Sequence, residues 1–244
     1  MAVITLNSLE VRPMSEPKPL VPWYRQAAAA VPHHFFLKSI GTTVFISVFF
    51  VLYFHLLRNP TYSATVMPVI WLDHWVSFQP LALPAYLSLW LYVSLMPAFF
   101  ATRSELYRYG LAMALMCAFG LMIFYVWPTA APASDIDWAQ YPNVEFLKDL
   151  DASGNAFPSL HVATAFYSCF WMHRLLRRFG GPVWVHALNW TWCMAIIYST
   201  LAIRQHVAVD AVAGMVLGGL VAWFSLSGRM FPQPQRQAEA GAPE

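Results

Sequence analysis

The sequence predicts an all-α membrane protein, a polytopic bundle of six transmembrane helices. The chain has 244 residues, of which 59% are hydrophobic and 11% are charged, and its mean hydropathy is +0.50. This composition leaves too little polar surface to cover a water-soluble globule of this size. The apolar residues also gather in segments of about 20 residues, the length that crosses a hydrocarbon core roughly 30 Å thick.

We expect six membrane spans, of which the fourth is the shortest. They cover residues 40–57, 84–101, 110–127, 157–171, 183–203 and 207–227. Residues 66–80 are also hydrophobic, but Pro68, Asp73, His74 and Gln79 interrupt them. We interpret this segment as interfacial or re-entrant rather than as a seventh span, because Trp71 and Trp75 suit the headgroup level. Asp73 is the one acidic residue of this segment that we consider for shaping a site.

The positive charges predict the orientation. With a cytoplasmic N-terminus, 11 of the 14 Lys and Arg residues fall on the inner side, and only Arg58, Lys148 and Arg204 fall on the outer side. This excess follows the positive-inside rule. The outer face is therefore periplasmic or extracellular, and the localisation we expect is a bacterial inner (cell) membrane.

Three regions follow from the composition. Residues 1–33 form a polar N-terminal leader, residues 34–228 a single six-helix membrane domain, and residues 229–244 a tail rich in Pro, Gln, Ala and Glu. That tail cannot bury enough apolar surface to order itself, so we expect it to be disordered.

Two histidines carry the functional prediction. His161 begins the fourth apolar segment, and His206 follows the fifth. The chain descends one helix and climbs the next between them, so both imidazoles are expected at the outer membrane face. Asp210 lies four residues after His206, which on a helix places the carboxylate beside the imidazole.

This set of side chains suits covalent catalysis on a phosphate. A neutral imidazole can attack phosphorus and form a phosphohistidine. A second imidazole can protonate the leaving group and later activate the acceptor. Pro158 suits a helix start, and the amides near Ser159 and Leu160 can bind an anion at the positive helix end. Arg204 is our candidate phosphate clamp, because a guanidinium binds two oxygens at once. Lys148 is the second candidate cation.

The motif Pro158-Ser159-Leu160-His161, followed by His206 and Asp210 in the spacing H-x-x-x-D, resembles two motifs of the type 2 phosphatidic acid phosphatase superfamily. The Leu in the first motif and the segment 127–132 are similar to the branch that includes inositol phosphorylceramide synthases. The resemblance implies that His206 is the nucleophile, Asp210 its orienting carboxylate and His161 the general acid and base. It also implies a reaction without metal or cofactor.

The sequence departs from the family pattern in its cations. The basic motif that precedes the histidine motifs is not found, and Ala133 and Ser134 occupy the place where the branch often has an Arg. Thr200 stands six positions before His206, where many members have another Arg. Either Arg204 and Lys148 replace these groups, or the site is weakened or specialised for a phosphodiester with less charge.

We therefore predict a membrane lipid phosphatase that acts on a lipid phosphate at the outer leaflet. A phosphotransferase that moves a phospho-headgroup to a lipid or sugar hydroxyl remains open, because the same residues serve both reactions. A non-catalytic lipid-binding or transport protein is the third alternative, since ionisable residues at membrane depth also mark transport sites. The expected partners are the lipid substrate and the bilayer, with no nucleic acid.

Overall fold

The computed structural model describes residues 21–150 and 155–227, and these residues are mostly helical. The α-helices are α1 (Trp23–Ala30), α2 (Phe35–Arg58), α3 (Leu83–Leu95), α4 (Arg103–Val126), α5 (Pro142–Leu150), α6 (Leu160–Phe179), α7 (Val183–Ala202) and α8 (Ala208–Leu226). Four short 3-10 helices are η1 (Trp71–Trp75), η2 (Pro80–Ala82), η3 (Met96–Phe99) and η4 (Trp138–Gln140). Two short strands, β1 (Thr65–Val66) and β2 (Thr129–Ala130), pair in parallel.

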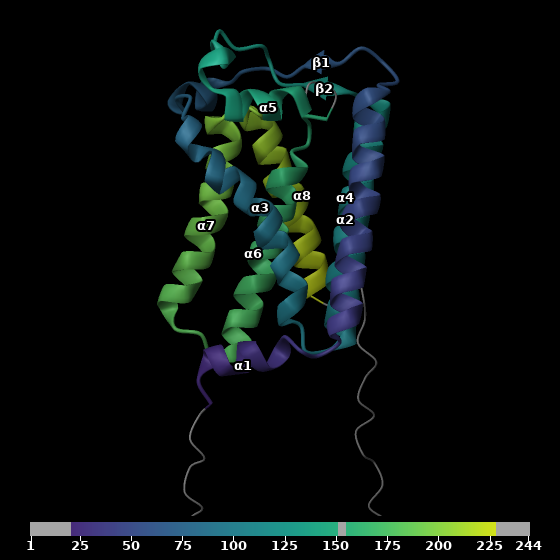
Figure 1. Ribbon diagram of the computed structural model, residues 1–244, viewed down its shortest axis with the longest axis vertical. Helices are drawn as coiled ribbons and strands as arrows, with labels where there is room; N and C mark the ends of the chain where they lie inside the picture. Colours follow the sequence, from purple (N-terminus) through teal and green to yellow (C-terminus); the bar gives the residue numbers. More distant parts are fainter. Residues whose placement is uncertain (1–20, 151–154, 228–244) are drawn as a thin grey trace, which may run out of the picture.

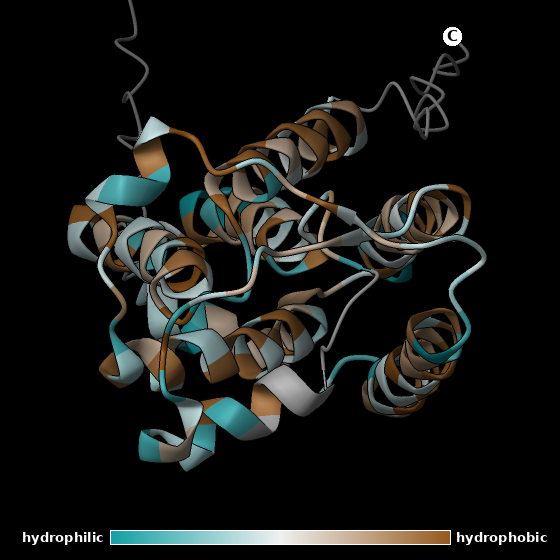
Figure 2. Cartoon of the chain, turned by 90° about the horizontal axis from the view of Figure 1, so that it is seen from above, coloured by the Kyte–Doolittle hydropathy of each residue, from teal (hydrophilic) through white to brown (hydrophobic). Residues whose placement is uncertain are grey.

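The long helices run along the long axis of the molecule, side by side, in Figure 1. Helix α1 crosses the lower end of this bundle, and α5 with the β1–β2 pair lies across the upper end. Seen along the helices in Figure 2, the long helices are largely brown or pale, whereas much of the teal lies in short helices and loops. The bundle therefore presents hydrophobic side chains outward, as a bilayer requires.

In the part of the chain that the structure describes, four helical segments are long and apolar enough to cross a membrane. They are Phe35–Arg58, Pro80–Phe99, Arg103–Val126 and Ala208–Leu226. Side chains on the outer surface of these helices are large and hydrophobic, such as Val51 at 70% exposure and Leu91 at 62%. This arrangement indicates a membrane protein. Helices α6 and α7 are 20 residues long, but polar side chains such as Arg177 and Arg178 lower the apolar content of α6.

Local sequence explains where several helices begin and end. Thr102 caps α4, because its Oγ1 accepts a hydrogen bond from the Glu105 amide. Ser159 caps α6 in the same way through the Val162 amide. Gly180 ends α6 in a left-handed conformation with φ of 72°, which glycine adopts at low cost. Pro182 then precedes α7.

The predicted segment boundaries shift by several residues in the structure. The fourth apolar segment, expected at 157–171, becomes an α-helix at Leu160–Phe179, because the charged residues after Trp171 continue the helix. Segment 66–80 contains the end of β1, the 3-10 helix η1 and, at Pro80, the first residue of η2, so it does not cross a membrane as a helix of its own.

The region expected as a polar leader contains a helix at its end. Residues 1–20 lie outside the described residues, but Trp23–Ala30 form the helix α1, which the interpretation as a polar leader did not include. Trp23, Ala27 and Ala30 share one helix face and pack against the core. Lys38 holds the next turn by donating from Nζ to the carbonyl oxygens of Ala30 and Ala98. The predicted C-terminal tail also lies outside the described residues.

Helix α6 lies at the centre of the bundle and packs most extensively against α8 and α7. Two glycines allow α6 and α8 to approach closely. A Cβ at Gly214 would meet the carbonyl oxygen of Ser159 at 2.5 Å, and one at Gly218 would clash with the backbone of Ala163. The G-x-x-x-G pattern therefore serves packing inside one chain. This close contact fixes the start of α6 against the first half of α8.

Candidate active site

The structure brings His161 and His206 together near the upper end of the bundle. His161 is the second residue of α6, and His206 lies in the turn between α7 and α8. Their ring centroids are 6.0 Å apart. His206 is 4% exposed and thus almost fully buried. The two rings are tilted by 57° to each other, so two imidazoles from different parts of the chain lie side by side in the interior of the bundle.

Asp210 lies beside His206 on the first turn of α8. The distance from His206 Nδ1 to Asp210 Oδ2 is 3.6 Å, slightly longer than a hydrogen bond. The same Oδ2 accepts a hydrogen bond from the Val207 amide at 3.1 Å. Asp210 is fully buried. This carboxylate therefore directs Nδ1 of His206 toward itself and leaves Nε2 on the other side of the ring.

The two histidine segments are tied together through the backbone. The amide of Ser159 donates a hydrogen bond of 3.1 Å to the carbonyl oxygen of Asp210. Ser159 is fully buried, and its Oγ accepts from the Val162 amide. The role of Ser159 in this structure is thus to begin α6 and to hold it against α8. Leu160 packs onto Gly120 of α4 and points into the apolar interior.

A tight turn places His206 after α7. The carbonyl oxygen of Thr200 accepts from the amides of both Gln205 and His206, at 3.0 and 3.1 Å. Arg204 adopts a left-handed conformation with φ of 59°, which reverses the chain. Its Nη2 donates to the carbonyl oxygen of Val76 at 3.0 Å, so the guanidinium is bound to the segment before α3. Arg204 as a phosphate clamp stays a prediction, and a clamp would require this guanidinium to turn from Val76 toward the histidines.

Several polar atoms of this cluster have no hydrogen-bond partner within the described residues. They are His161 Nε2, both ring nitrogens of His206 and Asp210 Oδ1, and all are buried. A buried polar atom without a partner costs about 1–3 kcal/mol, so a cluster of them points to a ligand site. Lys148 lies on α5, but its side chain lies outside the described part of the structure. No cluster of three or more metal-ligating side chains occurs among the described residues.

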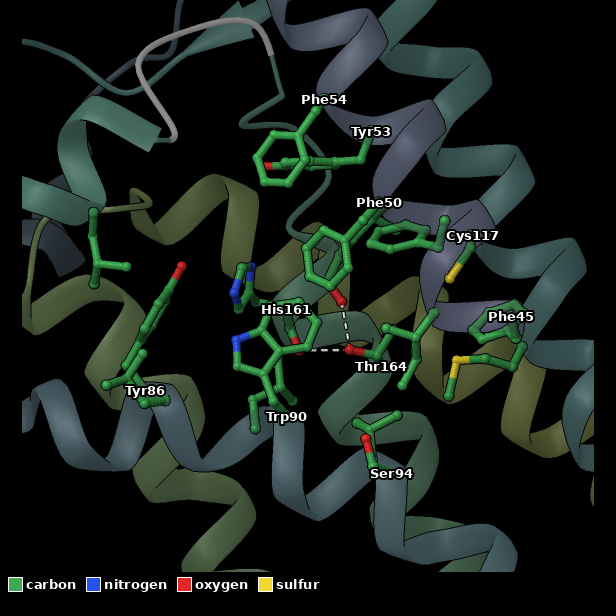
Figure 3. Close-up of a pocket in the computed structure, with 18 residues that line it drawn as sticks. Phe45, Phe50, Tyr53, Phe54, Tyr86, Trp90, Ser94, Cys117, His161 and Thr164 are labelled. Carbon is green, nitrogen blue, oxygen red and sulfur yellow. Dashed lines mark hydrogen bonds between the residues drawn. The ribbon is translucent and has the colours of Figure 1, made fainter. Parts of the chain in front are cut away.

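Two aromatic residues that the sequence analysis did not select hold His161. Tyr86 stacks on the imidazole with centroids 4.6 Å apart, and Trp90 meets it edge-on at 5.3 Å. Figure 3 shows His161 between these two α3 side chains. Tyr86 and Trp90 are four residues apart and thus share a helix face. That spacing was visible in the sequence, but nothing in it indicated which face meets His161.

His161 also borders an apolar cavity of about 400 Å³. Aromatic side chains of α2, among them Phe50, Tyr53 and Phe54, cover one side of it in Figure 3. A second cavity, of about 510 Å³, shares lining residues such as Phe45 and Ser94 with the first and extends toward Lys38. Two neighbouring apolar cavities therefore lie between α2, α3 and α4, and the first of them borders His161.

Comparison with known protein families matches residues 40–231 to the PAP2 superfamily. The chain belongs to the PAP2 superfamily. This match covers α2 from Ile40 onward, all helices from α3 to α8, and both histidine motifs. PAP2 superfamily proteins are generally phosphatases and phosphotransferases, so an enzyme of this type is the function class that membership suggests. A search of curated proteins and a search of solved structures found no match.

Proposed function

We propose that this PAP2 superfamily protein is a membrane enzyme that cleaves a lipid phosphate through a phosphohistidine on His206. The observation that carries the proposal is the buried cluster of His161, His206 and Asp210, in which the ring centroids of the two imidazoles lie 6.0 Å apart and ring nitrogens of both lack a hydrogen-bond partner. The substrate phosphate lies between the two rings.

His206 is the nucleophile in this mechanism. Asp210 faces Nδ1, so the proton resides on that nitrogen and the lone pair of Nε2 is free to attack phosphorus. The new N–P bond forms as the bond from phosphorus to the lipid oxygen breaks. The Asp210 carboxylate stabilises the positive charge that develops on the ring.

His161 supplies the proton. In its imidazolium form it protonates the departing oxygen, and the neutral ring then accepts a proton from the incoming water. Water attacks phosphorus, the N–P bond breaks, and inorganic phosphate leaves. The positive end of α6, with the amides of Leu160 and His161, stabilises the phosphate oxygens. Arg204 and Lys148 join them if substrate draws their side chains to the phosphate.

The substrate is a lipid because an apolar space begins at His161. The two neighbouring cavities between α2, α3 and α4 are lined almost entirely by hydrophobic side chains, which suits a hydrocarbon chain. A phosphate between the histidines and a chain in this space belong to one amphipathic molecule.

A phosphotransferase is the second candidate. The observation in its favour is that Arg204 is bound to Val76 and does not contact the histidine pair. A phosphodiester carries less charge than a phosphate monoester, so it needs fewer cations. The Leu160-containing motif, which resembles the inositol phosphorylceramide synthase branch, points the same way.

The chain crosses the membrane six times in this proposal, with α6 and α7 added to the four most apolar segments. The N-terminus is cytoplasmic, and the histidine pair faces the periplasm or exterior of a bacterial inner membrane. The excess of Lys and Arg on the N-terminal side supports this orientation.

The test uses purified protein in EDTA. Three substrates are offered: phosphatidic acid, undecaprenyl pyrophosphate, and a phospholipid with ceramide. We expect released phosphate for a phosphatase, or a new lipid without free phosphate for a transferase. The variant His206→Ala should lose at least about 10³-fold in rate, because the nucleophile is gone.

Three results would contradict the proposal. Equal turnover by His206→Ala excludes the nucleophile assignment. Complete dependence on an added divalent metal indicates another mechanism. Binding of the lipids without any turnover indicates the non-catalytic alternative.

A further inference from the structure

Asp73 links the segment before α3 to the start of α8. It lies in the middle of η1 and is 5% exposed. Its Oδ1 accepts from the Ala208 amide at 2.7 Å, and its Oδ2 accepts from the Ile70 amide at 2.8 Å. One buried carboxylate thus joins two parts of the chain that are 135 positions apart.

The N-cap residue of α8 supplies no side-chain cap, so the Ala208 amide depends on the contact with Asp73. This N-cap residue is Val207, whose side chain has no hydrogen-bond acceptor. Asp210 accepts from the Val207 amide, and Asp73 accepts from the next amide, that of Ala208. Two carboxylates therefore satisfy consecutive amides at the positive end of α8, where negative charge is favourable.

The helix start determines the geometry of the histidine. His206 directly precedes Val207, and its partner Asp210 lies in the first turn of α8. His206 and Asp210 lie on either side of Ala208, whose amide Asp73 binds. The 3.6 Å distance between His206 Nδ1 and Asp210 Oδ2 therefore depends on the backbone that Asp73 holds. A displacement of about 1 Å in such a pair costs on the order of 10²-fold in rate.

The turn that carries Asp73 exposes two tryptophans. Trp71 is 62% exposed and Trp75 is 78% exposed, and their rings contact each other edge-on. Exposed tryptophans prefer the headgroup level of a bilayer. In the proposed orientation, the two tryptophans hold this turn at the headgroup level, and Asp73 contacts α8 from there.

We infer that Asp73 is a positioning residue, which holds the start of α8 so that His206 and Asp210 keep their catalytic alignment. This inference rests on the proposed function. Asp73 touches neither the substrate nor the histidine rings, and it acts through the amide of Ala208.

The variant Asp73→Asn tests the inference with little change in volume. Asparagine has one side-chain oxygen, so its amide group must face one of the two backbone donors. We expect kcat to fall by about 10-fold to 100-fold, with KM within about twofold, since the lipid contacts are untouched. The exposed neighbour His74 provides the matched control, and His74→Asn should leave both constants unchanged.

A second variant separates positioning from a loss of folding. Val207→Thr keeps the side-chain shape and adds a hydroxyl that can cap α8 locally. We expect Asp73→Asn with Val207→Thr to recover part of the lost kcat. Amide exchange, followed by mass spectrometry, should be faster across residues 207–213 in Asp73→Asn and slower again in the double variant.

Two measurements, kcat and the rate of amide exchange, test whether Asp73 positions the start of α8. An unchanged kcat in Asp73→Asn overturns it, as does a loss explained wholly by a smaller folded fraction in thermal unfolding. If the wild-type protein turns over no lipid phosphate, the proposed function fails. Amide exchange then still decides whether Asp73 holds the start of α8, and unchanged exchange overturns the inference.

Discussion

At the scale of single residues, Asp210 has two roles that one substitution can separate. Its Oδ2 accepts from the Val207 amide and also lies 3.6 Å from Nδ1 of His206. The first contact supports the helix start, and in the proposed mechanism the second orients and stabilises the imidazole.

The substitution Asp210→Asn should remove the second role and keep the first. Asparagine can still accept from Val207, but it cannot stabilise an imidazolium by charge. We expect kcat to fall on the order of 10²-fold to 10⁴-fold, as when a carboxylate that orients a catalytic histidine becomes an amide. The measurement is kcat with a lipid phosphate, together with the thermal unfolding midpoint. A rate within threefold of wild type would limit Asp210 to capping α8.

Residue types and their spacing predicted this cluster well. His161, His206 and Asp210 were selected from the sequence, and the structure places all three together. The cations were harder to predict, because the direction of Arg204 depends on the left-handed turn at its own backbone and on the Val76 carbonyl. Nothing in the local sequence encodes that partner.

At the scale of elements, the separation of α2 from α3 is the main feature for substrate binding. These helices follow each other in sequence, yet α2 packs mainly against α4. The apolar cavities lie in the space between them. A hydrocarbon chain of the lipid in this space should contact side chains of α3, so substitutions there should change its binding.

The variant Ser94→Phe should shorten this space. Ser94 borders both cavities, so a phenyl ring there displaces part of a long chain. We expect kcat/KM for a long-chain lipid phosphate to fall by about tenfold, the equivalent of about two methylenes left unburied. A short-chain analogue with the same headgroup should be unaffected.

Leu91→Phe is the matched control for this experiment. Leu91 is on the same helix but is 62% exposed on the outer surface. It should leave both substrates unchanged. Equal losses for the short and long chains in Ser94→Phe would show that the ring disturbs the catalytic residues rather than the chain site.

At the scale of the whole molecule, the prediction concerns orientation in the membrane. Ser63 lies before α3 and Ser104 at the start of α4, and both are exposed. The three native cysteines are buried, so they should resist a polar maleimide. Ser63→Cys and Ser104→Cys then report on opposite sides of one membrane span.

We expect an impermeant maleimide to label Ser63→Cys from the periplasmic or outer side and Ser104→Cys only after the membrane is permeabilised. The measurement is the mass shift of the protein from treated cells with the outer membrane opened. The reverse pattern would place the histidine pair on the cytoplasmic side. Labelling of both from one side would contradict the span formed by α3.

The sequence by itself determined the properties that depend on composition and local spacing. Apolar segment length predicted the helical membrane bundle, and the positions of His161, His206 and Asp210 predicted a phosphate site. These signals are local, because a helix is built from contacts within four residues and a membrane span from the transfer of its own side chains.

Only the tertiary structure decided which distant groups complete the site. It brought Tyr86 and Trp90 onto His161, bound Arg204 to Val76, and placed Asp73 at the start of α8. Each of these contacts joins segments more than 70 positions apart. These contacts form because of how the helices pack and where turns reverse the chain direction. No local sequence pattern indicates which distant residues will meet.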